Sequence, residues 1–379
     1  MPNPAFSARI ERMKLRRKGT SDQLRVATES ISNQRYDGLE KYTLLEDVLH
    51  LSESWENRGK GDSAIRYIIG AMQPVDARYT EISFETASRI ENQLSKKLAH
   101  NLDFRVQGSV PLDIHIKGFS DVDLLIIDTQ MLMYDVNGGG SYSPTSRDGR
   151  DVIIELREAA RDALEMAFPT ALVDDNNAKS LRITGGSLQR EVDVVPSIWW
   201  DTKEYQSMKR EEDRGVTIID KNTRERIYNA PFLHIKRIKD KCDQCNGGIR
   251  KSIRLLKTLK ADSKDEGSDI DLSSYDIASL MFHADANNLN HSTYYELAVL
   301  VETHRLLNYL SQNYEVAMQL DVPNGTRKIF EKPESHVELL KLTEMVNSVV
   351  TEVLREITGR PTDFYANDKC DVLRKQMVY

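Results

Sequence analysis

The sequence predicts an α+β fold, in which a mixed sheet with helices forms a core that is followed by a helical lobe. Two observations predict this class. Between residues 76 and 225, short apolar strands alternate with amphipathic helices, and from residue 226 onward apolar residues recur at the helical spacing of three and four. We therefore divide the 379 residues into an N-terminal helical extension (1–75), an α+β core (76–225) and a C-terminal helical lobe (226–379).

The N-terminal extension carries few signals. Residues 9–17 are rich in arginine and lysine, and residues 39–52 and 64–72 have apolar side chains at helical spacing. The basic tract is either a solvated arm, which we favour, or a contact for a partner or for nucleotide phosphates. A further amphipathic helix, residues 83–102, is expected to lead into the core.

The most informative stretch, residues 107–128, begins with Gln107-Gly108-Ser109. A glycine lets the backbone approach a phosphate closely, and the serine hydroxyl and neighbouring N–H groups can donate to the phosphate oxygens. Pro111 suits the first turn of a helix, so we expect the Gly-Ser pair at a positively polarised helix N-terminus. These residues predict a phosphate-binding loop.

Two acidic residues open the apolar run that follows this loop. In Asp121-Val122-Asp123, side chains two positions apart point to the same face of a strand, so both carboxylates project together while Val122 enters the core. Two hard oxygen ligands side by side, with phosphates opposite, make a Mg²⁺ site.

A third carboxylate is expected from a later strand. Phosphoryl transfer with two metal ions needs a further ligand for the ion that activates the attacking hydroxyl. Residues 190–196 alternate polar and apolar side chains and end at Pro196, which indicates a strand that leaves the sheet there. Asp193 is the candidate ligand, and Glu191, on the same face, is the alternative.

The other elements follow from periodicity and from helix-breaking residues. We expect strands at residues 171–173, 180–184, 192–195 and 216–220, and helices at residues 151–168, 231–241, 249–260, 274–282, 293–311 and 335–357. Trp199 and Trp200 either pack where the two lobes meet, which we favour, or line a nucleotide cleft.

In this order, the motifs resemble the polymerase-β-type nucleotidyltransferases, and within them the bacterial cGAS/DncV-like enzymes. Three later matches support the narrower family. Asn229-Ala230-Pro231 resembles its Asn-Pro segment, with Ala230 inserted; Leu255-Leu256-Lys257 resembles its helical Leu-Leu-Lys; and Ser273-Ser274-Tyr275 resembles its Ser-Tyr element. The likeness covers most of the chain.

The resemblance implies an activity. Enzymes of this family join nucleoside triphosphates, ATP often among them, with release of pyrophosphate, and then re-bind the linear intermediate and close a ring. The product is a cyclic di- or trinucleotide, a second messenger that a separate effector protein reads in bacterial anti-phage (CBASS-type) signalling. Base identity, ring size, linkage, trigger and oligomeric state stay open.

The resemblance also implies roles for single residues. Two Mg²⁺ ions, which Mn²⁺ can replace, would be held by Asp121, Asp123 and Asp193, the catalytic carboxylates. Lys257 and one of Ser273 and Ser274 would hold the donor triphosphate together with the Gly-Ser loop. These roles are assigned to the residues by their positions in the matching motifs. Tyr275 would stack on a base.

Composition narrows the class of protein. The net charge of -7 argues against a dominant binding surface for DNA or RNA, although a local basic patch stays possible. No apolar run approaches the length of a membrane span and the first residues lack an apolar signal core, so we expect a cytoplasmic protein. Three cysteines give no disulfide framework.

Two other functions remain compatible with these motifs. One is a nucleotidyltransferase that makes linear oligonucleotides or that modifies RNA or protein, since such enzymes have similar cores. The other is an inactive nucleotide-binding scaffold. The presence of all three carboxylates argues against the second.

Overall fold

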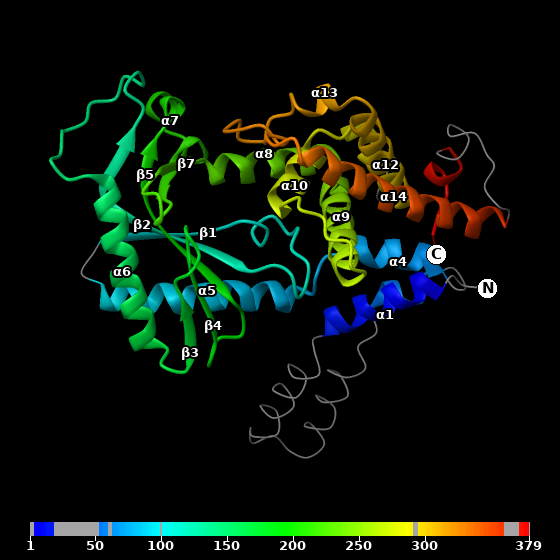
Figure 1. The fold of residues 1–379 in the computed structure, drawn as a ribbon, viewed down its shortest axis with the longest axis horizontal. Coiled ribbons are helices and arrows are strands. Elements are labelled where there is room, and N and C mark those ends of the chain that lie inside the picture. The colour runs from blue at the N-terminus through cyan, green and yellow to red at the C-terminus, as the bar shows by residue number, and fades with distance from the viewer. Residues whose placement is uncertain are drawn as a thin grey trace, which may run out of the picture.

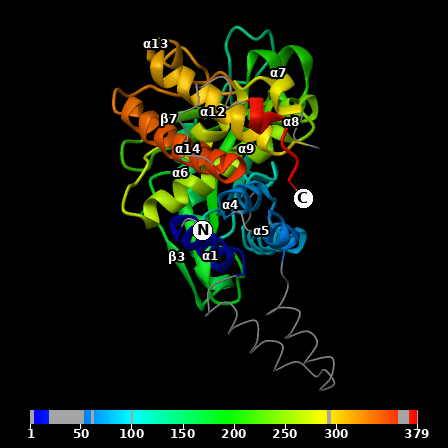
Figure 2. The same cartoon turned by 90° about the vertical axis from the view of Figure 1, so that its right-hand side faces the viewer.

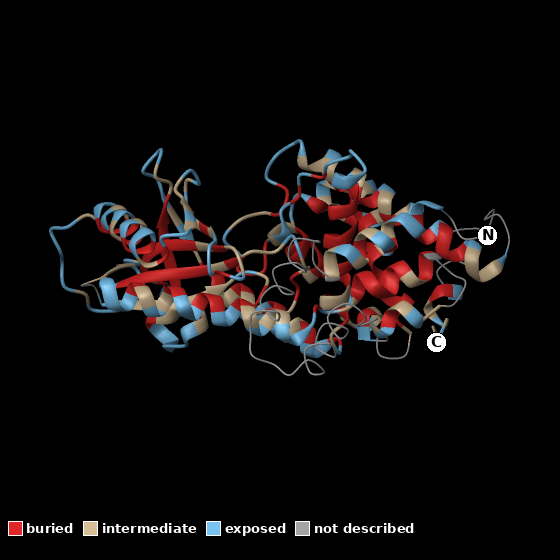
Figure 3. Cartoon of the chain, turned by 90° about the horizontal axis from the view of Figure 1, so that it is seen from below, coloured by how far each residue is buried: buried red, intermediate tan, exposed pale blue. Residues whose placement is uncertain are grey.

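The chain folds into a sheet lobe and a helical lobe that lie side by side (Figure 1). This computed structural model describes residues 4–18, 53–59, 63–98, 101–290, 295–359 and 371–378. Buried residues occupy the interior of both lobes (Figure 3). The α+β class, with a mixed sheet followed by a helical lobe, is confirmed.

The sheet lobe contains seven strands in the order β1-β2-β5-β4-β3, and β6 and β7 continue from β5. The strands are β1 (Leu102–Gln107), β2 (Val122–Tyr134), β3 (Ala171–Asp174), β4 (Leu181–Gly185), β5 (Val192–Asp201), β6 (Gly215–Ile219) and β7 (Arg226–Asn229). Only β2 and β5 pair in parallel among these strands; every other pairing is antiparallel. The sheet is therefore mixed, as expected.

Alternation along β2 gives the sheet two different faces. Val122, Leu124 and Ile126 point to one face, where they pack with α5 (Ala77–Lys97) and α6 (Gly149–Ala167). Leu125 and Ile127 point to the other face, where they pack with residues of β5 and β6 and with Phe232, at the start of the helix that follows β7. Asp123 belongs to this second face, which is the face that the helical lobe approaches.

The helix before β1 differs in its bounds from the predicted helix at residues 83–102. It begins at Ala77, because the Asp76 carboxylate accepts a hydrogen bond from the Arg78 N–H and caps the first turn. It ends at Lys97, since Leu98 adopts an extended backbone and Leu102 already belongs to β1. The apolar positions of the helix pack on the sheet as predicted.

The prediction that the chain leaves the sheet at Pro196 is wrong. β5 continues to Asp201, with Pro196 opposite Ile126 of β2. On its other edge, β5 pairs with β4 only as far as Val194 and with β6 only from Ile198. Pro196 therefore lies in the interval where no ladder on that edge needs an N–H donor, which is the position that a strand tolerates for proline.

Most of the remaining helices make up the second lobe, and two short ones, α7 and η2, belong to the sheet lobe. They are α1 (Pro4–Lys18), η1 (Ser54–Asn57), α4 (Ser63–Met72), α8 (Pro231–Gln244), α9 (Gly248–Asp265), α10 (Ser274–Phe282), α11 (Ala286–Leu289), α12 (Leu297–Gln312), α13 (Tyr314–Ala317) and α14 (Ser335–Thr358), while α7 spans Lys203–Met208 and η2 spans Glu211–Asp213. A single hydrophobic cluster contains residues from α1, α4, α8 to α10, α12 and α14. Figure 2, which views this lobe end-on, shows α4 beside α9 and α14, with α1 next to α4.

The basic N-terminal tract is not a solvated arm. Residues 9–17 lie in α1, whose side chains Phe6, Ile10 and Met13 are buried in the cluster of the helical lobe. The tract pairs with acidic residues in the last turns of α9: Arg9 lies 2.7 Å from Glu266, and Arg16 lies 2.7 Å from the buried Asp262. A buried carboxylate requires positively charged partners, so the basic residues of this tract hold α1 against the end of α9. The helix predicted at residues 39–52 lies outside the described residues.

The start of α8 joins the two lobes. Trp199 of β5 is buried and its ring centroid lies 5.7 Å from that of Phe232, in the first turn of α8. The indole N–H of Trp200 donates to Asp135 at 2.9 Å. Packing at the junction, which we favoured for these tryptophans, is confirmed for Trp199.

Candidate active site between the lobes

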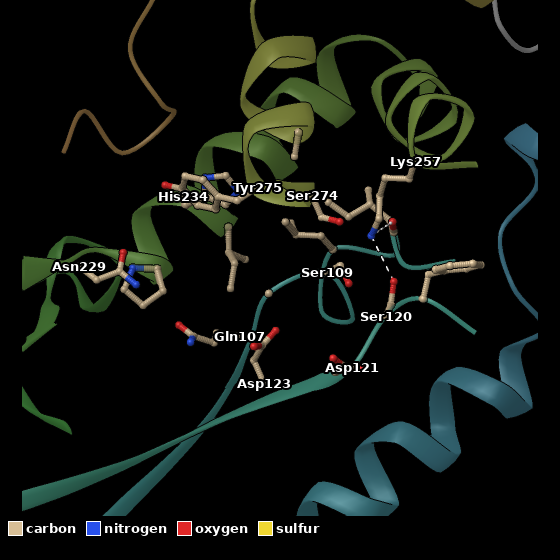
Figure 4. Close-up of a pocket in the computed structure, with 17 residues that line it drawn as sticks. Gln107, Ser109, Ser120, Asp121, Asp123, Asn229, His234, Lys257, Ser274 and Tyr275 are labelled. Carbon is tan, nitrogen blue, oxygen red and sulfur yellow. Dashed lines mark hydrogen bonds between the residues drawn. The ribbon is translucent and has the colours of Figure 1, made fainter. Parts of the chain in front are cut away.

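A cavity of about 350 Å³ lies between the second face of the sheet and the helical lobe (Figure 4). Its volume is within the range of small-molecule sites. The sheet lobe contributes Gln107, Gly108, Ser109, Leu112, Ile114, Phe119, Ser120, Asp121 and Asp123, and the segments around α8, α9 and α10 contribute Asn229, Pro231, His234, Ile235, Lys257, Ser274, Tyr275 and Ala278. Of the ten site residues predicted from the sequence, only Asp193 and Ser273 are not in its lining.

The loop after β1 lies very close to the carboxylate of Asp123. Gly108 has a φ of 77°, and a Cβ atom built on it would lie 2.1 Å from Oδ2 of Asp123. Both facts favour glycine: the first because L side chains rarely adopt this backbone, the second because even a Cβ atom would displace the Asp123 carboxylate. The glycine identified in the sequence is thus needed for contact with the strand that carries the aspartates.

The expected helix N-terminus at this loop is wrong. Residues 108–113 form successive turns, in which Asp113 N–H donates to Val110 O at 3.1 Å and Ile114 N–H donates to Ser109 O at 3.2 Å. Asp113 has a φ of 54°, a left-handed conformation that ends the run before a helix forms. Pro111 starts a turn here, and any phosphate would meet turn N–H groups without a helix dipole behind them.

Three carboxylates meet on adjacent parallel strands. Asp123 of β2 lies in register with Asp193 of β5, and Asp121 precedes the first residue of β2. Burial raises the pKa of Asp123 to about 7, and the negative charges of Asp193 and Asp121 add to the rise. Burial also raises the pKa of Asp121, and the positive charge of Arg182 opposes this rise. Like charges crowded in this way favour a cation among them.

The cation found among them is an arginine that the sequence reasoning missed. Arg182 of β4 lies opposite Asp193, and its guanidinium approaches Asp193 at 3.2 Å, Glu191 at 2.9 Å and Asp121 at 3.5 Å. The alternation Leu181-Arg182-Ile183, with both neighbours buried on the α5 and α6 face, is the signal that places Arg182 on the carboxylate face. Only the pairing of β4 with β5 identifies its partners.

The carboxylates fit a hard divalent cation by chemistry rather than by present arrangement. All three donors are carboxylate oxygens, which are the ligands that Mg²⁺ and Mn²⁺ prefer. In the part of the chain that the structure describes, however, no group of three or more His, Cys, Asp or Glu side chains is arranged to hold a metal ion. Arg182 contacts two of the three carboxylates, Asp193 and Asp121.

Lys257 of α9 reaches the cavity from the helical lobe. Its Nζ donates to Ile114 O at 3.0 Å and to Ser120 Oγ at 3.2 Å, both in the loop between β1 and β2. The side chain is buried, and burial lowers its pKa to about 7, which the charge of Asp123 opposes. Lys257 therefore connects the helical lobe to the phosphate-binding loop.

We expect Lys257→Met to lower the free energy of unfolding by about 1–3 kcal/mol, because it leaves the buried Ile114 carbonyl without its donor and removes a second hydrogen bond, to Ser120. The substitution should also raise the KM for nucleoside triphosphates, since the loop loses its anchor. The measurements are denaturant unfolding and steady-state kinetics.

Lys260 provides the matched control, because it donates from the next turn of the same helix to Leu272 O at 2.6 Å and does not line the cavity. Lys260→Met should destabilise the protein similarly and leave KM unchanged. Equal KM values for the two variants would contradict this role of Lys257.

The two serines at the start of α10 have different positions. Ser273 is the N-cap: its Oγ accepts from Asp276 N–H at 3.0 Å and donates to the Asp276 carboxylate at 2.6 Å. Ser274 lines the cavity. The sequence left the choice between them open, and the structure brings only Ser274 to the cavity.

A pair of stacked rings forms one end of the cavity. Tyr275 of α10 and His234 of α8 have ring centroids 4.4 Å apart and an interplanar angle of 24°. Among the described residues, Nδ1 of the buried His234 has no hydrogen-bond partner. Burial lowers the pKa of His234 to about 4, so the ring is neutral near pH 7. Sequence reasoning identified Tyr275 but not His234, although the two side chains lie together in Figure 4.

Comparison with known proteins shows which family the chain resembles. Residues 236–353 match the family model of the cGAS/DncV-like nucleotidyltransferase C-terminal helical domain. The chain is 28% identical over 305 residues to a c-di-GMP synthase of a Lachnospiraceae bacterium, which covers 74% of this chain and 85% of the relative. It is 29% identical over 321 residues to a c-di-GMP synthase of Capnocytophaga granulosa, covering 76% and 88%.

A solved structure extends the likeness over both lobes. The STING-associated CdnE c-di-GMP synthase from Capnocytophaga granulosa superposes with a TM-score of 0.64 and 26% identity, covering 86% of this chain and 97% of that one. Over both lobes, the chain is similar to the bacterial cGAS/DncV-like nucleotidyltransferases. The polymerase-β-like core and the helical lobe of this family are thus confirmed, and the protein is a nucleotidyltransferase.

Two further general statements can be made about this cGAS/DncV-like nucleotidyltransferase. Nucleotidyltransferases generally use a divalent metal ion, which agrees with the oxygen donors of its carboxylates. None of the helices in the described ranges is both long and apolar enough to cross a membrane.

Proposed function

We propose that this nucleotidyltransferase condenses nucleoside triphosphates into a cyclic dinucleotide. The observation that carries the proposal is that the Gly108-Ser109 loop and the carboxylates of Asp121 and Asp123 line one cavity, with Asp193 on the adjacent strand. The c-di-GMP synthases that the chain resembles over both lobes support a cyclic product and make GTP the first substrate to test.

The carboxylates would hold the metal ions. Asp121 and Asp123 would ligate two Mg²⁺ ions, and Asp193 would ligate the one nearer the acceptor. When bound, these ions neutralise charge on the pyrophosphate leaving group and lower the pKa of the attacking ribose hydroxyl. Mn²⁺ has the same ligand preference and is expected to substitute.

Other residues of the cavity would hold and orient the substrates. The turn after Gly108 and the hydroxyls of Ser109 and Ser274 donate to the triphosphate, and Lys257 keeps that turn in place. Gln107, at the end of β1, lies opposite Asp123 and contributes its amide. This arrangement confines the donor α-phosphate beside the carboxylates, which is the positioning that phosphoryl transfer needs.

The bond changes balance within this arrangement. The acceptor hydroxyl oxygen forms a bond to the donor α-phosphorus, the bond from that phosphorus to the β-phosphate oxygen breaks, and pyrophosphate leaves. Asp193 would take the hydroxyl proton. A second transfer, in which the linear intermediate supplies both the hydroxyl and the triphosphate, closes the ring.

Tyr275 provides the face for a base. Its ring already stacks on the neutral ring of His234, and a nucleobase can extend that stack. We infer that Tyr275 orients the base and that His234 holds the tyrosine ring in place.

The test is a product analysis. The purified chain is incubated with GTP alone and with all four nucleoside triphosphates, with Mg²⁺ or Mn²⁺, and phosphatase-resistant products are identified by mass spectrometry. A resistant cyclic dinucleotide that is absent from the Asp121→Ala/Asp123→Ala variant supports the proposal. Linear products alone would replace it with an oligonucleotide polymerase, and a resistant product from the variant as well would remove the assigned carboxylates.

We further propose that the product is a cytoplasmic second messenger that a separate effector protein reads during anti-phage defence. The description of the Capnocytophaga relative as STING-associated supports a partner of this kind. Cells that carry the gene with its genomic neighbours should resist phage, and the Asp121→Ala/Asp123→Ala variant should abolish the resistance. Equal plaque counts for both strains would contradict the defence role without affecting the enzymatic one.

A further inference from the structure

Arg182 occupies a position that the proposed reaction leaves unexplained. It projects from β4 to the carboxylate face, and its guanidinium contacts two of the three proposed metal ligands, Asp193 at 3.2 Å and Asp121 at 3.5 Å. Its shortest contact, 2.9 Å, is to Glu191, which is not one of those three. An arginine in this place supplies the positive charge that the metal ions would supply.

The guanidinium and a divalent ion compete for these oxygens. A guanidinium forms directed hydrogen bonds to carboxylates in a planar fork, and those bonds occupy lone pairs and bring a positive charge where a metal ion would bind. The side chain is anchored by β4 and still has 41% of its surface exposed, so it has room to turn. When the guanidinium leaves Asp193 and Asp121, its contact with Glu191 can persist.

We propose that Arg182 is a resident counter-ion that holds the catalytic carboxylates of the metal-free enzyme, moves onto Glu191 when divalent metal ions load, and thereby weakens metal binding in the absence of nucleotide. Arg182 is a positioning residue on this view, and the inference rests on the proposed function through the three carboxylates. Metal ions then load together with the triphosphate, whose phosphates supply the missing ligands.

The test measures Mn²⁺ binding to the full chain without nucleotide, by titration calorimetry and by the electron paramagnetic resonance signal of free Mn²⁺. Arg182→Met should bind Mn²⁺ about tenfold more tightly than the wild type, since charge-assisted hydrogen bonds no longer compete for the ligands. Arg161→Met is the matched control. Arg161 is similarly exposed, pairs with Asp162 on the surface of α6, and its loss changes the net charge equally.

Glu191 provides a second, independent test with the opposite sign. Glu191→Gln removes the place to which Arg182 moves, so Mn²⁺ binding should weaken several-fold. In the double variant Arg182→Met/Glu191→Gln this effect should disappear, because no arginine remains to be moved. Weakening that persists in the double variant would make Glu191 a metal ligand and overturn the proposed movement.

Arg182→Lys keeps the proposal testable if Arg182→Met does not fold. A lysine retains the charge but has no fork to bridge several carboxylates, so Mn²⁺ should bind more tightly than to the wild type. Unchanged or weaker Mn²⁺ binding in the arginine variants would overturn the inference. Since no nucleotide is present, this failure is distinct from failure of the product assay.

Discussion

Asp123→Asn is expected to lower nucleotidyl transfer by about 10³-fold or more while raising the stability of the metal-free protein. Activity falls because an amide oxygen is a poor substitute for the carboxylate that lies between the phosphate-binding loop and Asp193. Stability rises because the carboxylate is a buried charge beside two others, Asp193 and Asp121.

The stability effect has a defined pH dependence. The pKa of Asp123 is raised from 3.8 to about 7 in the folded chain, so the folded state binds the proton more tightly than the unfolded state. The wild type therefore loses stability as pH rises from about 4 to about 7, and the asparagine variant lacks that loss, a difference of roughly 2–4 kcal/mol above about pH 8.

Thermal or denaturant unfolding in EDTA measures this difference. The variant should be clearly more stable than the wild type at about pH 8 and similar to it below about pH 4. Product formation is followed in the same preparations. A variant that keeps its activity would remove Asp123 from the reaction, and one that is less stable at about pH 8 would show that the carboxylates do not repel one another.

The parts of the site that the sequence predicts are those set by local pattern. Alternation in Asp121-Val122-Asp123 is enough to place both carboxylates on one face, and β2 has that alternation with Val122 buried. Helical spacing is likewise enough to bring Lys257 close to the cleft. In each case the neighbouring residues in the sequence decide where the side chain points.

The parts that the sequence does not predict depend on pairing between distant segments. Arg182 meets Asp121 only because β4 pairs with β5 and β5 pairs with β2. Pro196 stays in its strand only because the ladders on one edge are interrupted there. The domain boundaries at residues 75 and 225 stay a prediction, and the packing of α1 and α4 into the core of the helical lobe shows why local composition defines them poorly.

Gly108→Ala is expected to lower activity by about 10²-fold, because small displacements of reacting groups have effects of that size. The new Cβ atom would lie 2.1 Å from Oδ2 of Asp123, so the carboxylate must leave its present position. The substitution also places a side chain at a φ of 77°, which costs about 1–2 kcal/mol of stability.

Gly118 separates these two effects within the same loop. Its φ of 84° is equally left-handed, yet a Cβ atom there would have no heavy atom within 4 Å. Gly118→Ala should therefore destabilise the protein as much as Gly108→Ala does and retain most of its activity. If both variants lose activity alike, strain in the loop rather than the position of Asp123 limits the reaction; if only Gly108→Ala loses it, the close contact between loop and carboxylate is what the glycine provides.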